Sequence, residues 1–261
     1  NTVVQDVQLE NIGELATKLS NSYELQDLIF SSTHFYNYQL GKGDQYFETS
    51  LEKQDGAISY GLSGNFTIKD VFVVKKFINV INSIIGFDNF TYSESDSDAD
   101  IEINLGTCLT KNAWNSIFET DLCSSANGYF SSEDMIVWVD SDLYGLNRDR
   151  VLIHELGHSI GLNHSACQTT GLMSSHSNRD QSIISFSNFE IAQIKFLYSQ
   201  IHSVGNIETF SMDLESGITY KEMTSYTDLE AKELDSTMNN QFCPDEKSTV
   251  YEEGENKDDN S

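Results

Sequence analysis

Long apolar runs are missing from this sequence, and basic residues are scarce. No apolar stretch approaches the roughly 20 residues of a membrane-spanning helix, so we expect no membrane span. Lysine and arginine number 15 against 41 aspartates and glutamates, which gives a formal net charge of -26. A surface this negative repels phosphate groups, so nucleic acid and anionic membranes are disfavoured as partners. The charge favours divalent cations and basic ligands instead.

Proline, cysteine and an N-terminal leader are also sparse or missing. Pro244 is the only proline, and no function follows from that. The sequence starts at Asn1 without Met or a basic-then-apolar leader, which we interpret as a processed or trimmed form. Its four cysteines, an even count that fits an oxidising compartment, are Cys108, Cys123, Cys167 and Cys243. The most local pairing would join Cys108 to Cys123 and leave Cys167 with Cys243, but free buried thiols are an equal alternative.

What is present suits a packed domain, since 38% of the residues are hydrophobic and 11% aromatic. The clearest element is an amphipathic helix that begins after a capping-box pattern, Thr67 and Asp70. Apolar residues then recur at helical spacing as far as Ile85, and Gly86 is a natural stop.

The other expected elements follow from alternating or helical apolar patterns. Strands are predicted at residues 57–64, 88–92, 99–105 and 135–139, and helices at 12–19, 23–30, about 148–162 and from Ser187 onward. Ser187 and Glu190 repeat the capping-box pattern. We expect an N-terminal extension at 1–47, a catalytic domain at 48–202 and an acidic C-terminal extension at 203–261 whose end is disordered.

The segment with the strongest chemical signal is His154-Glu155-Leu156-Gly157-His158-Ser159-Ile160-Gly161-Leu162-Asn163-His164. On a helix, residues four apart share a face, so His154 and His158 can bind one metal ion. Gly161 tolerates a positive φ and lets the chain turn sharply, which brings His164 back to the same ion. Three imidazoles leave one zinc position open, which is the arrangement of a catalytic site.

Glu155 lies next to His154 and can reach a water molecule at that site without being a ligand. Zinc lowers the pKa of bound water toward about 7 and polarises a carbonyl. Glu155 can then take the water's proton and pass it to a leaving amine, as a general base and acid. The residues therefore predict a zinc metalloendopeptidase.

This eleven-residue segment resembles the metzincin zinc motif, and Ser165 directly after it makes the chain most similar to the matrixin (matrix metalloproteinase) branch. The resemblance covers about residues 50–202. It implies an α+β fold: a twisted mixed sheet with one antiparallel edge strand, an upstream helix, the zinc helix and a C-terminal helix. It also implies a methionine turn, for which Met173 is well placed as an apolar floor under the histidines.

The resemblance further implies that an edge strand before the zinc helix binds an extended peptide by strand addition. We assign this role to Ile136, Val137, Trp138 and Val139. The segment from His164 to Met173 is one residue longer than the usual matrixin spacing, and Ser174-Ser175 replaces the usual tyrosine and proline. The alternatives are therefore a metzincin of another branch, such as a processing or glycoprotein-directed protease, or a zinc-binding interaction protein on a protease scaffold.

The remaining expectations concern partners and regulation. The substrate would be a protein or peptide, and the enzyme a secreted monomer. Calcium is a candidate second ion at Asp96, Asp98 and Asp100, or at Glu133, Asp134, Asp140 and Asp142, although solvated acidic loops are favoured. No cysteine precedes Cys108, so a thiol switch is unavailable to residues 1–50. Asp44 could block the zinc from a prosegment, but a solvated turn is favoured there.

Overall fold

The computed structural model describes most of the central part of the chain. The described residues are 12–23, 28, 32, 34–39, 43–48, 54, 56–96, 98–106, 127–164, 171–173 and 186–199, with the backbone alone in 34–39 and 43–48. The four cysteines and the C-terminal extension lie outside these residues. Within them, no helix is both long and apolar enough to cross a bilayer.

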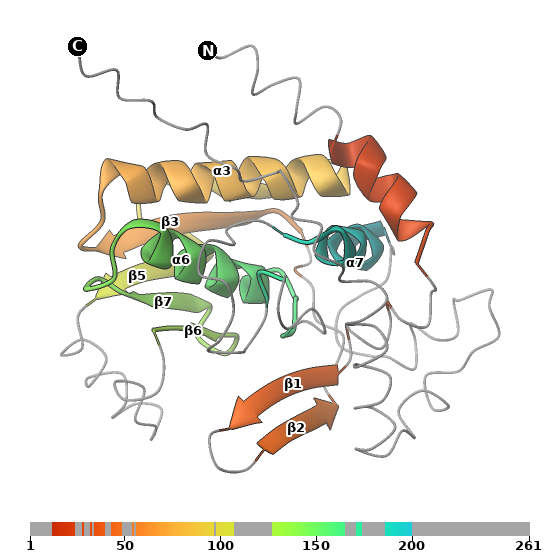
Figure 1. The fold of residues 1–261 in the computed structure, drawn as a ribbon. Coiled ribbons are helices and arrows are strands. Elements are labelled where there is room, and N and C mark those ends of the chain that lie inside the picture. Colours follow the sequence, from red (N-terminus) through yellow and green to blue (C-terminus); the bar gives the residue numbers. More distant parts are fainter. Residues whose placement is uncertain are drawn as a thin grey trace, which may run out of the picture.

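A five-stranded mixed sheet forms the centre of the fold (Figure 1). Its strands are β3 (Ile58–Gly64), β4 (Phe90–Tyr92), β5 (Ile101–Gly106), β6 (Gly128–Ser131) and β7 (Ile136–Asp140). Their order is β4-β3-β5-β7-β6, and only the β6–β7 pair is antiparallel. The predicted mixed sheet with one antiparallel edge strand is therefore confirmed.

Helix α3 (Ile68–Ile85) connects the parallel strands β3 and β4. The Thr67 side chain accepts a hydrogen bond from the Asp70 amide, and the Asp70 carboxylate accepts one from the Thr67 amide, so the predicted capping box forms. Gly86 ends the helix in the left-handed region with φ 90°, and its amide donates to the Asn82 carbonyl. Local sequence therefore fixes both ends of α3.

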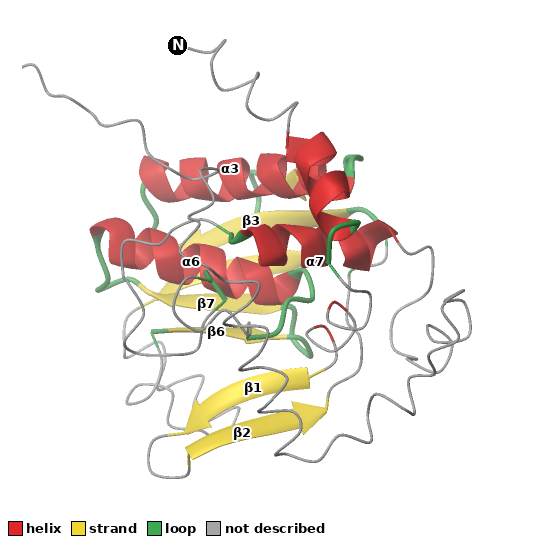
Figure 2. Cartoon of the chain, turned by 45° about the vertical axis from the view of Figure 1, so that its right-hand side comes forward, coloured by secondary structure: helices red, strands yellow, loops and turns green. Residues whose placement is uncertain are grey.

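Helices α6 (Gly145–Ser159) and α7 (Asn188–Ser199) lie with α3 on the same side of the sheet (Figure 2). The core between helices and sheet is rich in aromatic rings: Tyr60 lies 6.2 Å from Phe77 and 6.0 Å from Phe90, measured between ring centroids. Two core hydroxyls also bind the end of α6. The Tyr60 and Ser159 hydroxyls are 2.9 Å apart, and the Tyr198 hydroxyl donates to the Ile160 carbonyl at 2.9 Å.

Three features depart from the sequence predictions. Helix α6 begins and ends three residues earlier than expected. Strand β6 was not predicted at all. Residues 34–39 and 43–48 form an antiparallel pair, β1 (His34–Gln39) and β2 (Gly43–Glu48), although no strand was predicted before residue 57. Both views show this pair apart from the main sheet (Figures 1 and 2). The predicted N-terminal helix is present over residues 12–20.

Candidate metal centre

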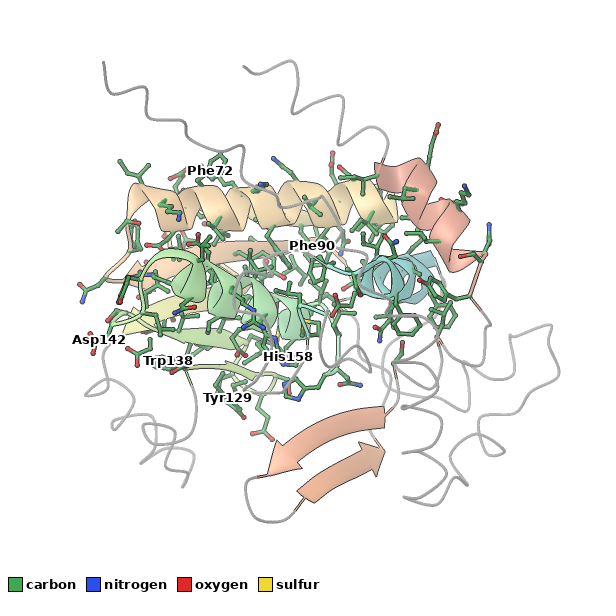
Figure 3. All side chains as sticks on the ribbon, in the orientation of Figure 1. Phe72, Phe90, Tyr129, Trp138, Asp142 and His158 are labelled. Atoms are coloured by element: carbon green, nitrogen blue, oxygen red, sulfur yellow. The ribbon has the colours of Figure 1, made fainter. Side chains whose placement is uncertain are left out.

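Three histidines meet at the C-terminal end of α6. The candidate ligand atoms of His154, His158 and His164 all lie within 4.8 Å of one another, and the Nε2 atoms of the first two are 3.2 Å apart. His158 extends from α6 below the helix in Figure 3. Four-residue spacing puts two of these side chains on one helix face, as the sequence implied. No other group of three metal-binding side chains occurs among the described residues.

A Schellman turn brings the third histidine to this place. The Gly161 amide donates to the His158 carbonyl at 2.9 Å, and the Leu162 amide donates to the Gly157 carbonyl at 3.1 Å. Gly161 has a φ of 97°, a conformation that costs little only for glycine. The helix thus ends after Ser159, and the chain reverses toward His164.

Two main-chain carbonyls fix the histidine tautomers. The Nδ1 atom of His154 is 2.8 Å from the Leu172 carbonyl oxygen, and that of His158 is 2.7 Å from the Leu162 carbonyl oxygen. A carbonyl can only accept, so each Nδ1 must carry the hydrogen and each neutral ring keeps its Nε2 lone pair free. Tetrahedral zinc with its usual bond lengths separates two imidazole nitrogens by about 3.3 Å, so this donor set fits zinc.

Met173 packs against α6 at Gly157. The residue is fully buried, and a β-carbon added to Gly157 would collide with its Sδ and Cε atoms. Because Gly157 lies between His154 and His158 in the sequence, the thioether packs on the helix turn that carries both histidines. The absence of a side chain at 157 is what lets Met173 approach this closely.

Glu190 on α7 anchors the turn that contains Met173. Its carboxylate is fully buried and accepts hydrogen bonds from the amides of Leu172 at 3.1 Å, Met173 at 2.7 Å and Ser187 at 2.7 Å. Burial raises the pKa of this carboxyl, although the hydrogen bonds it accepts oppose that rise. Since Leu172 also holds the His154 ring, Glu190 acts on the metal centre through one residue. The capping pattern predicted its bond to Ser187 but gave no signal of this second role.

Glu155 lies beside β6 and is only 7% exposed. A β-carbon built on Gly128 would stand 2.7 Å from its Cγ and 2.9 Å from its Oε1. Val151 on the preceding helix turn would be equally close to that β-carbon, at 2.6 Å. Glycine at position 128 therefore allows the edge strand to touch the side chain expected to act as the base.

The sheet order corrects the predicted peptide-binding edge. The sequence placed it at Ile136, Val137, Trp138 and Val139, but these residues form β7, which pairs with β5 on one side and β6 on the other. Their backbone groups are therefore engaged within the sheet. The antiparallel edge strand is β6. It is only four residues long and begins with glycine, so its sequence shows no clear strand pattern.

Two residues of β6 direct their backbone amides and carbonyls away from β7. The Asp140 amide donates to the Asn127 carbonyl at 3.0 Å, so these two residues form a hydrogen-bonded pair of the antiparallel ladder. Such pairs alternate with pairs whose amides and carbonyls point away from the partner strand. Gly128 and Phe130 are therefore the β6 residues whose backbone groups face away from β7.

The candidate calcium sites do not assemble among the described residues. The Asp100 carboxylate accepts bonds from the Ser59 amide and hydroxyl, which lower the pKa of Asp100. Asp134 accepts from the Ser131 hydroxyl at 2.7 Å. The Asp100 carboxylate thus joins the start of β5 to β3, and that of Asp134 serves a local turn. The alternative role of Asp44 as a zinc blocker concerns a side chain outside the described ones.

Comparison with known families gave one informative result. The matrixin family model matches residues 73–199, a stretch that contains most of α3, the three histidines, Met173 and α7. The comparison with curated proteins gave no significant match.

Proposed function

Since residues 73–199 are a matrixin zinc metalloprotease domain with its three-histidine site, we propose that this chain is an endopeptidase in which Glu155 activates the attacking water. The observation that carries the proposal is the convergence of His154, His158 and His164, with the first two Nδ1 atoms bound to carbonyls. Such second partners orient imidazoles toward a metal and raise their basicity.

Three histidines would hold the zinc, and the chain supplies the proton transfers. When bound, the ion contributes Lewis acidity, which makes water acidic near neutral pH and polarises the scissile carbonyl. Glu155 takes a proton from the attacking water and delivers it to the leaving amine. The close approach of Gly128 limits the positions open to its carboxylate, so the base is held close to its working position.

Strand β6 is the surface on which we propose the substrate binds. An extended peptide can pair with the amides and carbonyls of Gly128 and Phe130, adding a sixth strand. Because Gly128 touches Glu155, a peptide bound there passes next to the base. The site therefore suits an extended protein segment rather than a folded one, and we propose from the family resemblance that the enzyme works outside the cell.

The decisive experiment compares the full chain with Glu155→Ala for zinc content and for hydrolysis of casein. We expect about one zinc per chain in both proteins and a 10²- to 10⁴-fold lower rate in the variant, the range for loss of a general base. A chelator should abolish hydrolysis by the unchanged protein. Equal hydrolysis by both proteins would remove Glu155 from the mechanism.

Two other results would favour the alternatives. Zinc without casein hydrolysis, but with cleavage of one particular protein, would indicate a narrow-specificity protease. Zinc without cleavage of any substrate would indicate an interaction protein. A folded protein that takes up no zinc would contradict both the metal centre and the proposed activity. The extracellular location has its own test: detection of the protein in a cell lysate but not in the surrounding medium would contradict it.

A further inference from the structure

The chain before the matched region packs into the core of the catalytic domain. Ile12, Ala16 and Leu28 are 6%, 0% and 1% exposed and belong to the same buried cluster as the residues of α3 and α7. A β-carbon on Gly13 would stand 2.8 Å from the Ser83 carbonyl oxygen, so the N-terminal helix lies directly on α3. This much apolar burial is typical of a structural part of a domain.

The same segment also docks on α7. The ring of Tyr23 meets that of Phe189 edge-on with centroids 5.1 Å apart. The buried Ser32 hydroxyl accepts a hydrogen bond from the side-chain amide of Gln193 at 3.3 Å. The same hydroxyl donates to the Leu28 carbonyl at 2.8 Å. These contacts fix the position of Ser32 relative to the catalytic domain.

From this position, the segment reaches the turn that carries the third histidine. The Asn163 side-chain amide donates to the Ser32 carbonyl at 3.1 Å, and Asn163 directly precedes His164. On the other side of the turn, the Gln54 side-chain amide donates to the Ser159 carbonyl at 2.8 Å. The Gln54 main-chain amide also donates to the Tyr198 hydroxyl, which binds Ile160.

The third histidine needs such support more than the other two. His154 and His158 are held by helical hydrogen bonds, whereas His164 follows the helix end in irregular chain. Ordering irregular backbone costs about 1–2 kcal/mol for each residue, so contacts must offset that cost. Ser32 and Gln54 supply hydrogen bonds on both sides of the turn at residues 160–162.

We propose that the described part of residues 12–54 is a permanent brace that positions His164, and not part of a removable prosegment. The inference rests on the proposed zinc site but does not require that the site be catalytic. It assigns Asn163 as a positioning residue that acts through its neighbour. It also replaces the expectation that residues 1–47 are an extension separate from the catalytic domain.

Zinc release from the full chain, measured with a chelating dye, tests the brace independently of hydrolysis. Asn163→Ala should release zinc roughly 3- to 10-fold faster, the range for loss of one partly buried hydrogen bond. Gln193→Ala on α7 removes the donor to the Ser32 hydroxyl and should also accelerate zinc release. The double variant should show less than the product of the two effects, because both act through Ser32. Leu15→Ala, on the exposed side of the N-terminal helix, is the matched control and should release zinc at the original rate.

Unchanged zinc release in Asn163→Ala would overturn the proposal. So would independent effects of the two substitutions. If the protein binds zinc but cleaves nothing, the proposed function fails while this test still gives its answer. A folded chain that binds no zinc would overturn both proposals.

A second test cuts the chain within the connection between β1 and β2. A recognition site for a sequence-specific protease replaces residues 40–42, and the cut protein is separated by size under native conditions. We expect the N-terminal fragment to stay bound and the zinc to be retained, with no rise in casein hydrolysis. Departure of the fragment with a rise in hydrolysis would identify a prosegment and overturn the brace.

Discussion

Helices α3 and α6 are neighbours on one face of the sheet, yet they are stabilised in different ways. Of the nine buried residues of α3, eight are apolar and one is its capping aspartate, Asp70. By contrast, α6 buries Asp149, Arg150, His154 and Glu155, and its N-cap residue Tyr144 makes no side-chain cap bond. The buried face of α3 serves packing, whereas that of α6 also carries charged residues and side chains of the candidate metal centre.

The difference shows that a functional helix depends on partners far away in the sequence. Local sequence gives α3 its caps and its apolar stripe. The imidazoles of α6 depend instead on the Leu172 carbonyl, on the turn at Leu162 and on Met173 beneath them. The N-terminal part of the helix is tied to α3 by an ion pair between Arg148 and Asp70, with Nε and Oδ1 2.9 Å apart. Substitutions in the two helices should therefore change different observables.

The largest effect on the free energy of unfolding should come from α3. Phe77 is fully buried against Tyr60 and Phe186, so Phe77→Ala should lower that free energy by about 3–5 kcal/mol. Phe72→Ala on the same helix is the control, because its ring is 54% exposed and points away from the sheet (Figure 3). Urea titration should show a change below about 0.5 kcal/mol there. Similar losses in the two variants would contradict the assigned faces.

Removal of zinc should lower the free energy of unfolding by an amount that depends on the α6 histidines and not on the packing of α3. Zinc at a thousand times its dissociation constant stabilises a protein by about 4 kcal/mol through mass action. The unchanged protein and Phe77→Ala should both lose this increment in a chelator, as measured by thermal unfolding. His158→Ala should show no difference with and without zinc. A zinc-dependent increment in that variant would mean that another group of ligands holds the ion.

Gly157→Ala separates helix propensity from packing. Replacing glycine by alanine inside a helix normally stabilises it by about 1 kcal/mol. Here the new methyl group would collide with Met173, so we expect a loss of about 1–3 kcal/mol instead. The loss should shrink in a Met173→Ala background, which removes the colliding atoms. A stabilised single variant in urea titration would show that the thioether does not press on α6.

The smallest effects should come from the helix caps. Thr67→Ala removes the side-chain acceptor at the start of α3 and should cost about 1 kcal/mol. At the equivalent position of α6, Tyr144 is 84% exposed and unsuited to capping, so Tyr144→Asn should stabilise by a similar amount. Opposite shifts of the urea midpoint would support the comparison, and a loss in both variants would contradict it.

Sequence patterns predicted those parts of the fold that local chemistry determines. The bounds of α3 follow from Thr67 and Gly86, and the α6 metal ligands follow from four-residue spacing. The capping box of α7 was also correct, because Ser187 and Glu190 are three residues apart. In each case the deciding contacts lie within one helical turn.

The parts that were missed depend on contacts between distant segments. Strand β6 is four residues long, and nothing in its sequence shows that it, rather than β7, lies at the edge. Edge position depends on which strands pair. The second role of Glu190 requires the methionine turn to fold onto α7, and the contact of Ser32 with Asn163 joins residues 131 positions apart. None of these has a short-range signature.

The shortness of β6 sets a limit on how this protein can choose its ligands. Four residues of extended chain span roughly 14 Å, and two of them offer their backbone groups to a partner. Main-chain pairing is indifferent to side-chain identity, and each bond contributes only about 1 kcal/mol net. Peptides longer than about four residues should therefore gain no further affinity from this strand. Discrimination between sequences must come from the side chains that surround it.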